Sequence, residues 1–353
     1  MNFGYVPILK WKQGEQRTLR ELSHDDRARL LPLIELLPLK VSAGDTATKV
    51  LEAELIDLAD KLVKAKFDAV PCAIDTSALR PAYPAQAKLL AAVTGALVKK
   101  GVNVVPVIYP EMAVAGQVDV AALASVPTVL LRIRLGSVLS AQIPQFVVDL
   151  RKALASKKVA IHVVLDMYDI VGGDPVAMSA AVAPYVVAAI SSTQVASVTL
   201  AGGSFPQSLA GIGQGNKSLP RVEWQTWTAI RSKTEFSAVR FGDYAVTNPV
   251  PLVVEDPQNM NPAAQIRYAR ADDWMLLKAG GSKTGGFAQY NQLCKILIAH
   301  GAYSGAGFSF GDQRYDYHAK LGSKTGNYMT WRRDATSHHL VLTVRQVSGL
   351  LGL

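Results

Sequence analysis

Short apolar runs recur along the first 250 residues and alternate with stretches of helical periodicity. The runs are rich in Val, Ile and Leu and are bounded by Gly, Pro, Ser or Asp, which is typical of strands buried on both faces. They predict strands at residues 5–11, 30–36, 69–75, 103–109, 128–134, 159–166, 195–202 and 238–244.

Most of the intervening segments predict amphipathic helices. Residues 84–101 end in two lysines and a glycine, which are the charge and the cap that a helix C-terminus favours. Residues 144–158 and 174–190 continue the alternation, whereas the first connection, residues 13–30, is short and polar. In residues 48–65, one face collects the apolar positions Val50, Leu51, Leu55, Leu58, Leu62 and Val63.

Eight β/α units predict an α/β fold with a (β/α)8 TIM-barrel-like domain over residues 1–250. An open doubly wound sheet is the alternative, because one missed or falsely counted strand changes the topology. After Pro251 the alternation stops, and residues 251–353 are predicted to form a basic, loop-rich C-terminal extension. Within it, residues 264–280 predict a hairpin and residues 290–301 a short helix.

The composition is that of a globular protein, with 49% apolar and 18% charged residues. The net charge of +9 is concentrated in residues 261–353, which hold 11 Lys and Arg against 5 Asp and Glu. This excess favours an anionic ligand or nucleic acid as partner, although mild basicity also serves solubility alone. The N-terminal segment lacks the layout of a signal peptide, and the long apolar windows are interrupted. We therefore expect a cytoplasmic protein with no membrane partner.

Charged and aromatic residues stand at the predicted C-terminal ends of the strands. In a parallel barrel these ends form the mouth, where functional residues lie. Residues two positions apart on a strand, such as Lys10 and Lys12 or Arg132 and Arg134, are expected on the same face of the sheet. The strand-end set is Lys10, Lys12, Glu35, Asp75, Tyr109, Glu111, Arg132, Arg134, Asp166, Tyr168, Asp243 and Tyr244.

These strand-end charges support three alternatives. In the first, carboxylates hold Mg²⁺ or Mn²⁺, because hard cations prefer oxygen ligands, and Asp75, Asp166 and Lys10 are catalytic. In the second, the mouth only binds an anionic ligand. In the third, acids and arginines neutralise one another in a structural ion network. The metal ligands of the first alternative are Glu35, Asp75, Glu111 and Asp166.

Polar residues also gather in the segment TWRRDATSHHL, residues 330–340. His338 and His339 would point to opposite faces of a strand or diverge by about 100° on a helix, so we do not expect them to ligate one metal. One is expected to face a site while the other anchors the backbone. In the same way, we expect Trp331 to anchor the packing and Arg332 to bind a carboxylate or phosphate through paired hydrogen bonds.

Several of these segments together resemble the phage T4-type beta protein family. They are residues 5–22, 30–36, 241–246 and 308–340, so the resemblance spans nearly the whole chain. It implies a phage or bacterial protein, in some cases from a defence-like gene neighbourhood that would supply a protein partner, but no particular reaction. The residues of this chain that match the family's pattern are Lys10, Lys12, Gly14, Glu15, Gly242, Asp243, Tyr244, Ser309, Gly311, Asp312, Trp331, Arg332, His338 and His339.

The resemblance also pairs the start of the chain with its end, so we expect the extension to pack over the barrel mouth. His338 or His339 would then orient a carboxylate such as Asp312 or touch the ligand. We hypothesise a protein that handles a phosphorylated ligand or nucleic acid, in one version as a metal-dependent phosphodiesterase. The alternative is a non-catalytic module that binds a protein or nucleic acid. The expected ligand-binding residues are Lys12, Tyr109, Arg132, Arg134, Tyr168, Asp243, Asp312, Trp331, Arg332, His338 and His339.

Overall fold

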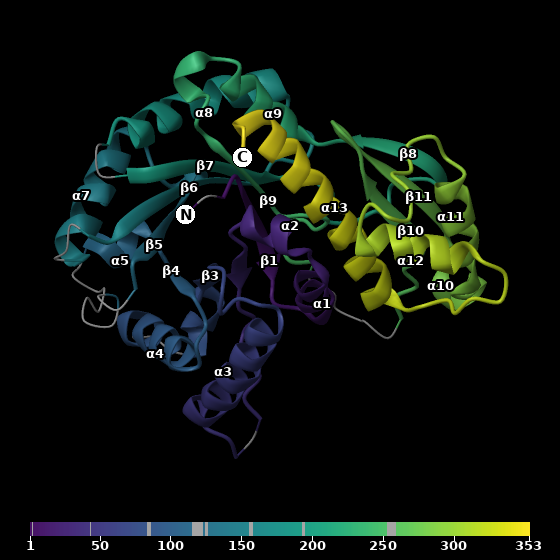
Figure 1. Ribbon diagram of the computed structural model, residues 1–353, viewed down its shortest axis with the longest axis horizontal. Helices are drawn as coiled ribbons and strands as arrows, with labels where there is room; N and C mark the ends of the chain where they lie inside the picture. The colour runs from purple at the N-terminus through teal and green to yellow at the C-terminus, as the bar shows by residue number, and fades with distance from the viewer. Residues whose placement is uncertain are drawn as a thin grey trace.

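Eight parallel strands close into a barrel in the computed structural model, which describes residues 1, 3–42, 44–82, 86–114, 123, 126–154, 158–192, 195–252 and 259–353 (Figure 1). The strand order is β1-β2-β3-β4-β5-β6-β7-β9, and β1 pairs with β9. This closure confirms the predicted (β/α)8 fold and makes the open-sheet alternative wrong. The barrel strands are β1 (Tyr5–Lys10), β2 (Leu33–Glu35), β3 (Cys72–Asp75), β4 (Val104–Ile108), β5 (Thr128–Arg134), β6 (Ala160–Asp169), β7 (Val195–Gly203) and β9 (Arg240–Asp243).

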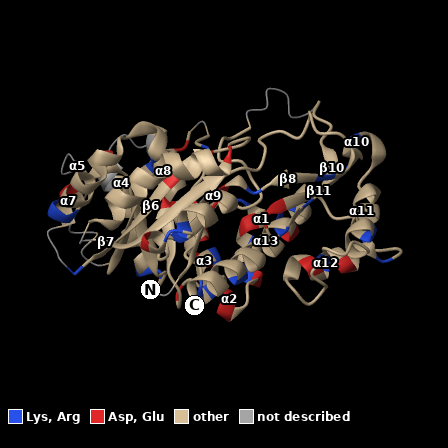
Figure 2. Cartoon of the chain, turned by 90° about the horizontal axis from the view of Figure 1, so that it is seen from above, with Lys and Arg blue, Asp and Glu red and all other residues tan. Residues whose placement is uncertain are grey.

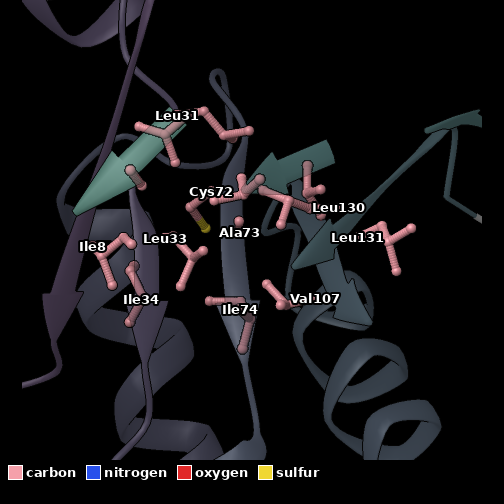
Figure 3. Close-up of a cluster of buried hydrophobic side chains, with 14 of the residues drawn as sticks. Ile8, Leu31, Leu33, Ile34, Cys72, Ala73, Ile74, Val107, Leu130 and Leu131 are labelled. Carbon is pink, nitrogen blue, oxygen red and sulfur yellow. The ribbon is translucent and has the colours of Figure 1, made fainter. Parts of the chain in front are cut away.

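Apolar side chains of neighbouring strands are buried in one core, as Figure 3 shows for Ile8, Ile34, Ile74 and Val107. The same strand register sets the height of the polar residues at the mouth. Lys10 lies opposite Glu35, which lies opposite Asp75, and Arg134 lies opposite Asp166. The strand-end charges therefore meet in one layer above the apolar core.

Helices surround the barrel, and the last one, α13, packs where the chain closes between β9 and β1 (Figure 1). Its residues Leu340, Val341, Val344 and Val347 are buried in the main apolar core. The helices are α1 (Gln13–Glu21), α2 (His24–Ala28), α3 (Ala47–Lys64), α4 (Gln86–Lys99), α5 (Pro110–Val114), α7 (Ile143–Leu154), α8 (Pro175–Ile190), α9 (Val222–Arg231) and α13 (Tyr328–Leu351). Short 3₁₀ helices lie at Ser77–Ala82, Leu135–Ser137, Ser140–Gln142 and Thr234–Phe236.

A second, smaller unit emerges from the mouth side of the barrel, and we call it the insert. It contains a three-stranded antiparallel sheet in the order β10-β11-β8. Its strands are β8 (Gly215–Pro220), β10 (Ala263–Ala269) and β11 (Asp273–Gly281), and its helices are α10 (Ser282–Gly285), α11 (Ala288–Ile298) and α12 (Phe310–Ala319). Because β8 precedes β9 in the chain, a division at residue 250 runs through this sheet.

The C-terminal region is more helical than the loop-rich pattern predicted, since α11, α12 and α13 occupy much of it. In α13, buried residues lie on all sides of the helix, and they include the polar Asp334, Ser337 and Thr343. The helix packs against both the barrel and the insert, so it has no single apolar stripe from which sequence periodicity would indicate a helix.

The two faces of the insert sheet have different partners. Ala264, Ile266 and Tyr268 of β10 pack in a core with α11 and α12. A separate core that includes Phe205 and Trp274 joins the sheet to the barrel loops. The β10 residues between these three, Gln265 and Arg267, therefore point to the opposite face, at the junction between insert and barrel.

Candidate functional site

Arg132 lies at the centre of the barrel mouth, and its side chain is fully buried. Its Nη1 donates hydrogen bonds to Glu35 Oε1 at 2.9 Å and to Asp75 Oδ2 at 2.6 Å. Its Nε and Nη2 donate to Asp166 Oδ2 at 3.0 and 2.8 Å. Four strands thus direct one guanidinium and three carboxylates to a single point.

Two tyrosines complete this cluster, which we call the Arg132 network. The Tyr109 hydroxyl donates to Asp75 Oδ2 at 2.6 Å. The Tyr244 hydroxyl accepts from Arg132 Nη2 at 2.6 Å and donates to Asp166 Oδ2 at 2.7 Å. Buried charges are stable only when they are paired and hydrogen-bonded, and these contacts meet that condition.

The pKa values in the network follow from burial and charge. Burial lowers the pKa of Arg132, but the surrounding acids, Asp166 first, outweigh it and raise that pKa well above its usual value. Burial raises the pKa of Asp75, but Arg132 and hydrogen bonds reverse this and leave it lowered. The pKa of Glu35 is raised, mainly by burial, with Asp75 adding to the shift. Glu35 therefore protonates more readily than an ordinary glutamate.

The arrangement favours a neutralised ion network over a cation site. The carboxylates of Glu35, Asp75 and Asp166 face a guanidinium, whereas Glu111 is exposed in the first turn of α5. Within the described residues, no group of three or more His, Cys, Asp or Glu is arranged to hold a metal ion. Binding of Mg²⁺ or Mn²⁺ at this mouth stays a prediction.

Three strand-end aspartates also fix the backbone that follows them. Their Oδ1 atoms accept hydrogen bonds from the amide two residues later, at 2.8–2.9 Å. The pairs are Asp75 with Ser77, Asp166 with Tyr168, and Asp243 with Ala245. Tyr168 and Ala245 have positive φ angles of 63° and 48°, which are unfavourable for residues with a side chain. These carboxylates therefore shape the mouth loops.

His338 and His339 point to different units of the molecule, as helical geometry requires. His338 Nδ1 lies 2.8 Å from Asp312 Oδ2, and its ring stacks on Tyr268 with centroids 3.8 Å apart. His339 Nε2 lies 2.7 Å from Asp243 Oδ2. Both histidine side chains are fully buried.

Through these contacts, His338 attaches α13 to the insert and His339 attaches it to the barrel. Burial lowers the pKa of His339 although Asp243 opposes the shift. The pKa of Asp243 is also lowered, because His339 and other partners outweigh the effect of burial. A neutral His339 imidazole that donates its Nε2–H to an ionised Asp243 carboxylate accounts for both lowered pKa values. The expectation that His338 orients Asp312 agrees with this geometry.

A pocket of about 510 Å³ lies at the junction of the barrel and the insert. Among the residues that the structure describes, its charged lining residues are Arg267, Lys278 and Arg332, with no Asp or Glu. Polar and aromatic side chains complete the wall: Gln207, Ser208, Asn261, Gln265, Tyr290, Tyr328 and Trp331. We call this cavity the basic pocket.

The insert sheet positions two of the three cations. Arg267 is on β10, and Lys278, on β11, lies directly opposite Gln265. Arg267 Nη1 donates to the Val246 carbonyl at 2.5 Å, and Lys278 Nζ donates to the Leu209 carbonyl at 2.6 Å. Burial lowers the pKa of Arg267 to about 10, and Arg332 contributes to the shift. The barrel loops thus hold both cations by carbonyl groups rather than by carboxylates.

One loop, residues 244–252, lies between the Arg132 network and the basic pocket. The Pro249 carbonyl accepts from Lys10 Nζ at 3.0 Å and from the Tyr168 hydroxyl at 3.4 Å. The Val246 carbonyl of the same loop bonds to Arg267. The barrel mouth and the basic pocket are therefore adjacent.

The N-terminal and C-terminal sequence patterns meet beside the pocket, where α1 packs on α13. Arg332 Nη1 lies 4.0 Å from Glu15 Oε1, and the Thr18 hydroxyl donates to the Arg333 carbonyl at 3.0 Å. Both α1 and α13 carry basic and acidic residues (Figure 2). Lys12, the residue before α1, is exposed.

The remaining predicted residues lie in different settings. Arg134 is exposed, and its guanidinium lies 4.3 Å from the centre of the Tyr168 ring. Trp331 is buried and stacks on Tyr290 at 4.2 Å, which agrees with a packing anchor. Lys278 and Gln265 were not predicted from the sequence. The alternation of β10 was the available signal, because it places Gln265 on the same face as Arg267.

A family model described as Beta protein matches residues 5–345, which include both the barrel and the insert. No curated protein matches the chain. Over the part of the chain that the structure describes, no helix is long and apolar enough to cross a membrane.

Proposed function

We propose that this chain, which belongs to the Beta protein family, binds a phosphate-bearing anion in the basic pocket as a binding module. The observation that carries the proposal is the charge of the wall, whose described residues include three cations and no carboxylate. Like charges around a cavity repel one another, and a bound anion removes that repulsion. Guanidinium groups suit phosphate in particular, since they donate paired hydrogen bonds to its oxygens.

The Arg132 network supports binding rather than hydrolysis. A metal-dependent phosphodiesterase would need Asp75 and Asp166 to bind a cation, but both already bind Arg132. The basic pocket offers cations to an anion without disturbing this network. A junction between two units is also a common place for a ligand pocket.

The cellular setting is part of the proposal. We place the binding reaction in the cytoplasm of a phage-infected or phage-defending bacterium, with a protein partner from the same gene neighbourhood. This part rests on the family resemblance, and the pocket geometry is independent of it.

Isothermal titration calorimetry with pyrophosphate as the probe tests the proposal. We expect Arg267→Gln and Arg332→Gln to weaken binding about tenfold or more, since a hydrogen bond to a charged group contributes about 1.5–3 kcal/mol. Arg270→Gln is the matched control, because Arg270 pairs with Asp273 at 2.6 Å and does not line the pocket. Equal affinity in the wild-type protein and both pocket variants would contradict the proposal.

A further inference from the structure

Basic residues continue out of the pocket towards the barrel mouth. Arg332 lines the pocket, and its charge adds to the effect of burial in lowering the pKa of Lys12. Burial also lowers the pKa of Lys10, and although Glu35 opposes this shift, Lys12 and Arg332 add to it. Arg267 and Arg332 line the pocket, Arg332 lies 4.0 Å from Glu15 of α1, Lys12 is the residue before α1, and Lys10 ends β1. We call these four cations the cation row.

Among the described residues, the carboxylates near the cation row only partly balance its charge. Glu15 is buried, with 3% of its surface exposed, and it lies 4.0 Å from Arg332. Glu35 bonds to Arg132 inside the barrel. A row of cations with buried counter-charges suits an extended anion that contacts it from solvent, more than a single compact phosphate.

Two features of the pocket wall suit a nucleobase. The Oε1 atom of Gln265 is buried and has no hydrogen-bond partner among the described residues, so a ligand N–H would satisfy it. Tyr328 lines the pocket, is 44% exposed and offers a ring for stacking. Aromatic stacking and polar contacts to base edges are the usual means of binding unpaired nucleotides.

We infer that the anion is the end of a single-stranded nucleic acid. Its terminal base enters the basic pocket against Tyr328 and Gln265, and its phosphates follow the cation row to Lys12 and Lys10. A single strand is required, because a terminal base that lies inside the pocket and meets Gln265 through its Watson–Crick edge cannot also be paired in a duplex. This inference rests on the proposed function and extends it to the ligand class.

Calorimetric titrations with four probes test the inference: a ten-nucleotide single-stranded DNA, the RNA of the same sequence, the blunt-ended DNA duplex and a mononucleotide. We expect a single strand to bind at least tenfold more tightly than the mononucleotide or the duplex. Comparison of the DNA and RNA single strands identifies which nucleic acid is preferred.

The double variant Lys10→Gln/Lys12→Gln separates the row from the pocket. It should weaken single-strand binding at least tenfold and leave mononucleotide affinity within twofold. The slope of log K against log salt should become shallower by about 1.4, because each phosphate that a lysine neutralises on a single strand accounts for about 0.7 of that slope. The control is Lys99→Gln/Lys100→Gln, two exposed lysines at the far end of α4.

The outcomes separate the inference from the proposed function. If the lysine pair has no effect and mononucleotide and single strand bind equally well, the inference is overturned while the basic pocket remains an anion site. If the duplex binds best, single-strand recognition is wrong. If pyrophosphate and every nucleic-acid probe fail to bind, the proposed function itself is wrong.

Discussion

Arg132 Nη2 lies 2.8 Å from Asp166 Oδ2, and neither side chain is exposed to solvent. A buried pair of this kind contributes little net stability relative to an apolar pair, but the loss of one partner leaves an uncompensated charge. A substitution in this pair therefore distinguishes a structural ion network from a catalytic site.

Asp166→Asn should lower the free energy of unfolding by about 3 kcal/mol, because it removes the charge that faces the buried Arg132 guanidinium. Urea unfolding followed by circular dichroism measures the change. Asp60→Asn, at an exposed position of α3, should change stability by no more than about 0.5 kcal/mol. A variant of Asp166 as stable as the wild-type protein would show that the network does not hold the mouth together.

Addition of Mg²⁺ or Mn²⁺ should leave the melting temperature of the wild-type protein unchanged. A ligand that binds only the native state raises that temperature by mass action, but Asp75 and Asp166 already bind Arg132. Thermal-shift measurements with and without each cation, on the wild-type protein and on Asp166→Asn, check this. A rise in the wild-type protein that Asp166→Asn abolishes would support the metal-site hypothesis instead.

The barrel and its mouth could be predicted because both depend on local pattern. Apolar runs of strand length identify the eight barrel strands, and parallel pairing brings their C-terminal ends together. Asp75, Arg132 and Asp166 therefore meet, although the sequence could not show that Arg132 binds the acids in place of a cation. That outcome depends on the distances between side chains.

The insert and α13 could not be predicted in the same way. β8, with the sequence GNKSLP, has no apolar alternation, and its strand conformation comes from pairing with the distant β11. In α13, buried polar residues such as His338 and His339 find their partners in two different units. Periodicity within a segment carries no information about such distant partners.

Gly311→Ala should destabilise the contact between α12 and α13. A Cβ atom at Gly311 would lie 2.1 Å from the Asp334 carbonyl oxygen, which is backbone and cannot rotate away. Overpacking of this kind costs about 1–3 kcal/mol, measured as the free energy of unfolding. Gly95→Ala on α4, where a Cβ atom meets nothing within 4 Å, should instead stabilise the protein by about 0.5–1 kcal/mol. Equal effects of the two substitutions would contradict the close approach of the helices.

Glu223, in the first turn of α9, should make stability depend on pH. Burial raises its pKa to about 7, with Asp243 adding to the shift and Arg221 opposing it. Between the ordinary glutamate pKa and about 7, the folded state holds a proton that the unfolded state has released. Stability from this group is therefore complete at low pH and falls as pH rises through this interval.

Glu223→Gln removes the titration while keeping the size of the side chain. Relative to this variant, the wild-type protein should lose about 1–3 kcal/mol of unfolding free energy between pH 4.5 and pH 7.5. Urea unfolding at several pH values measures the difference, with Glu52→Gln on the exposed face of α3 as the control. If the wild-type protein and Glu223→Gln respond to pH in parallel, Glu223 is ionised in the folded state throughout, and its burial does not raise its pKa.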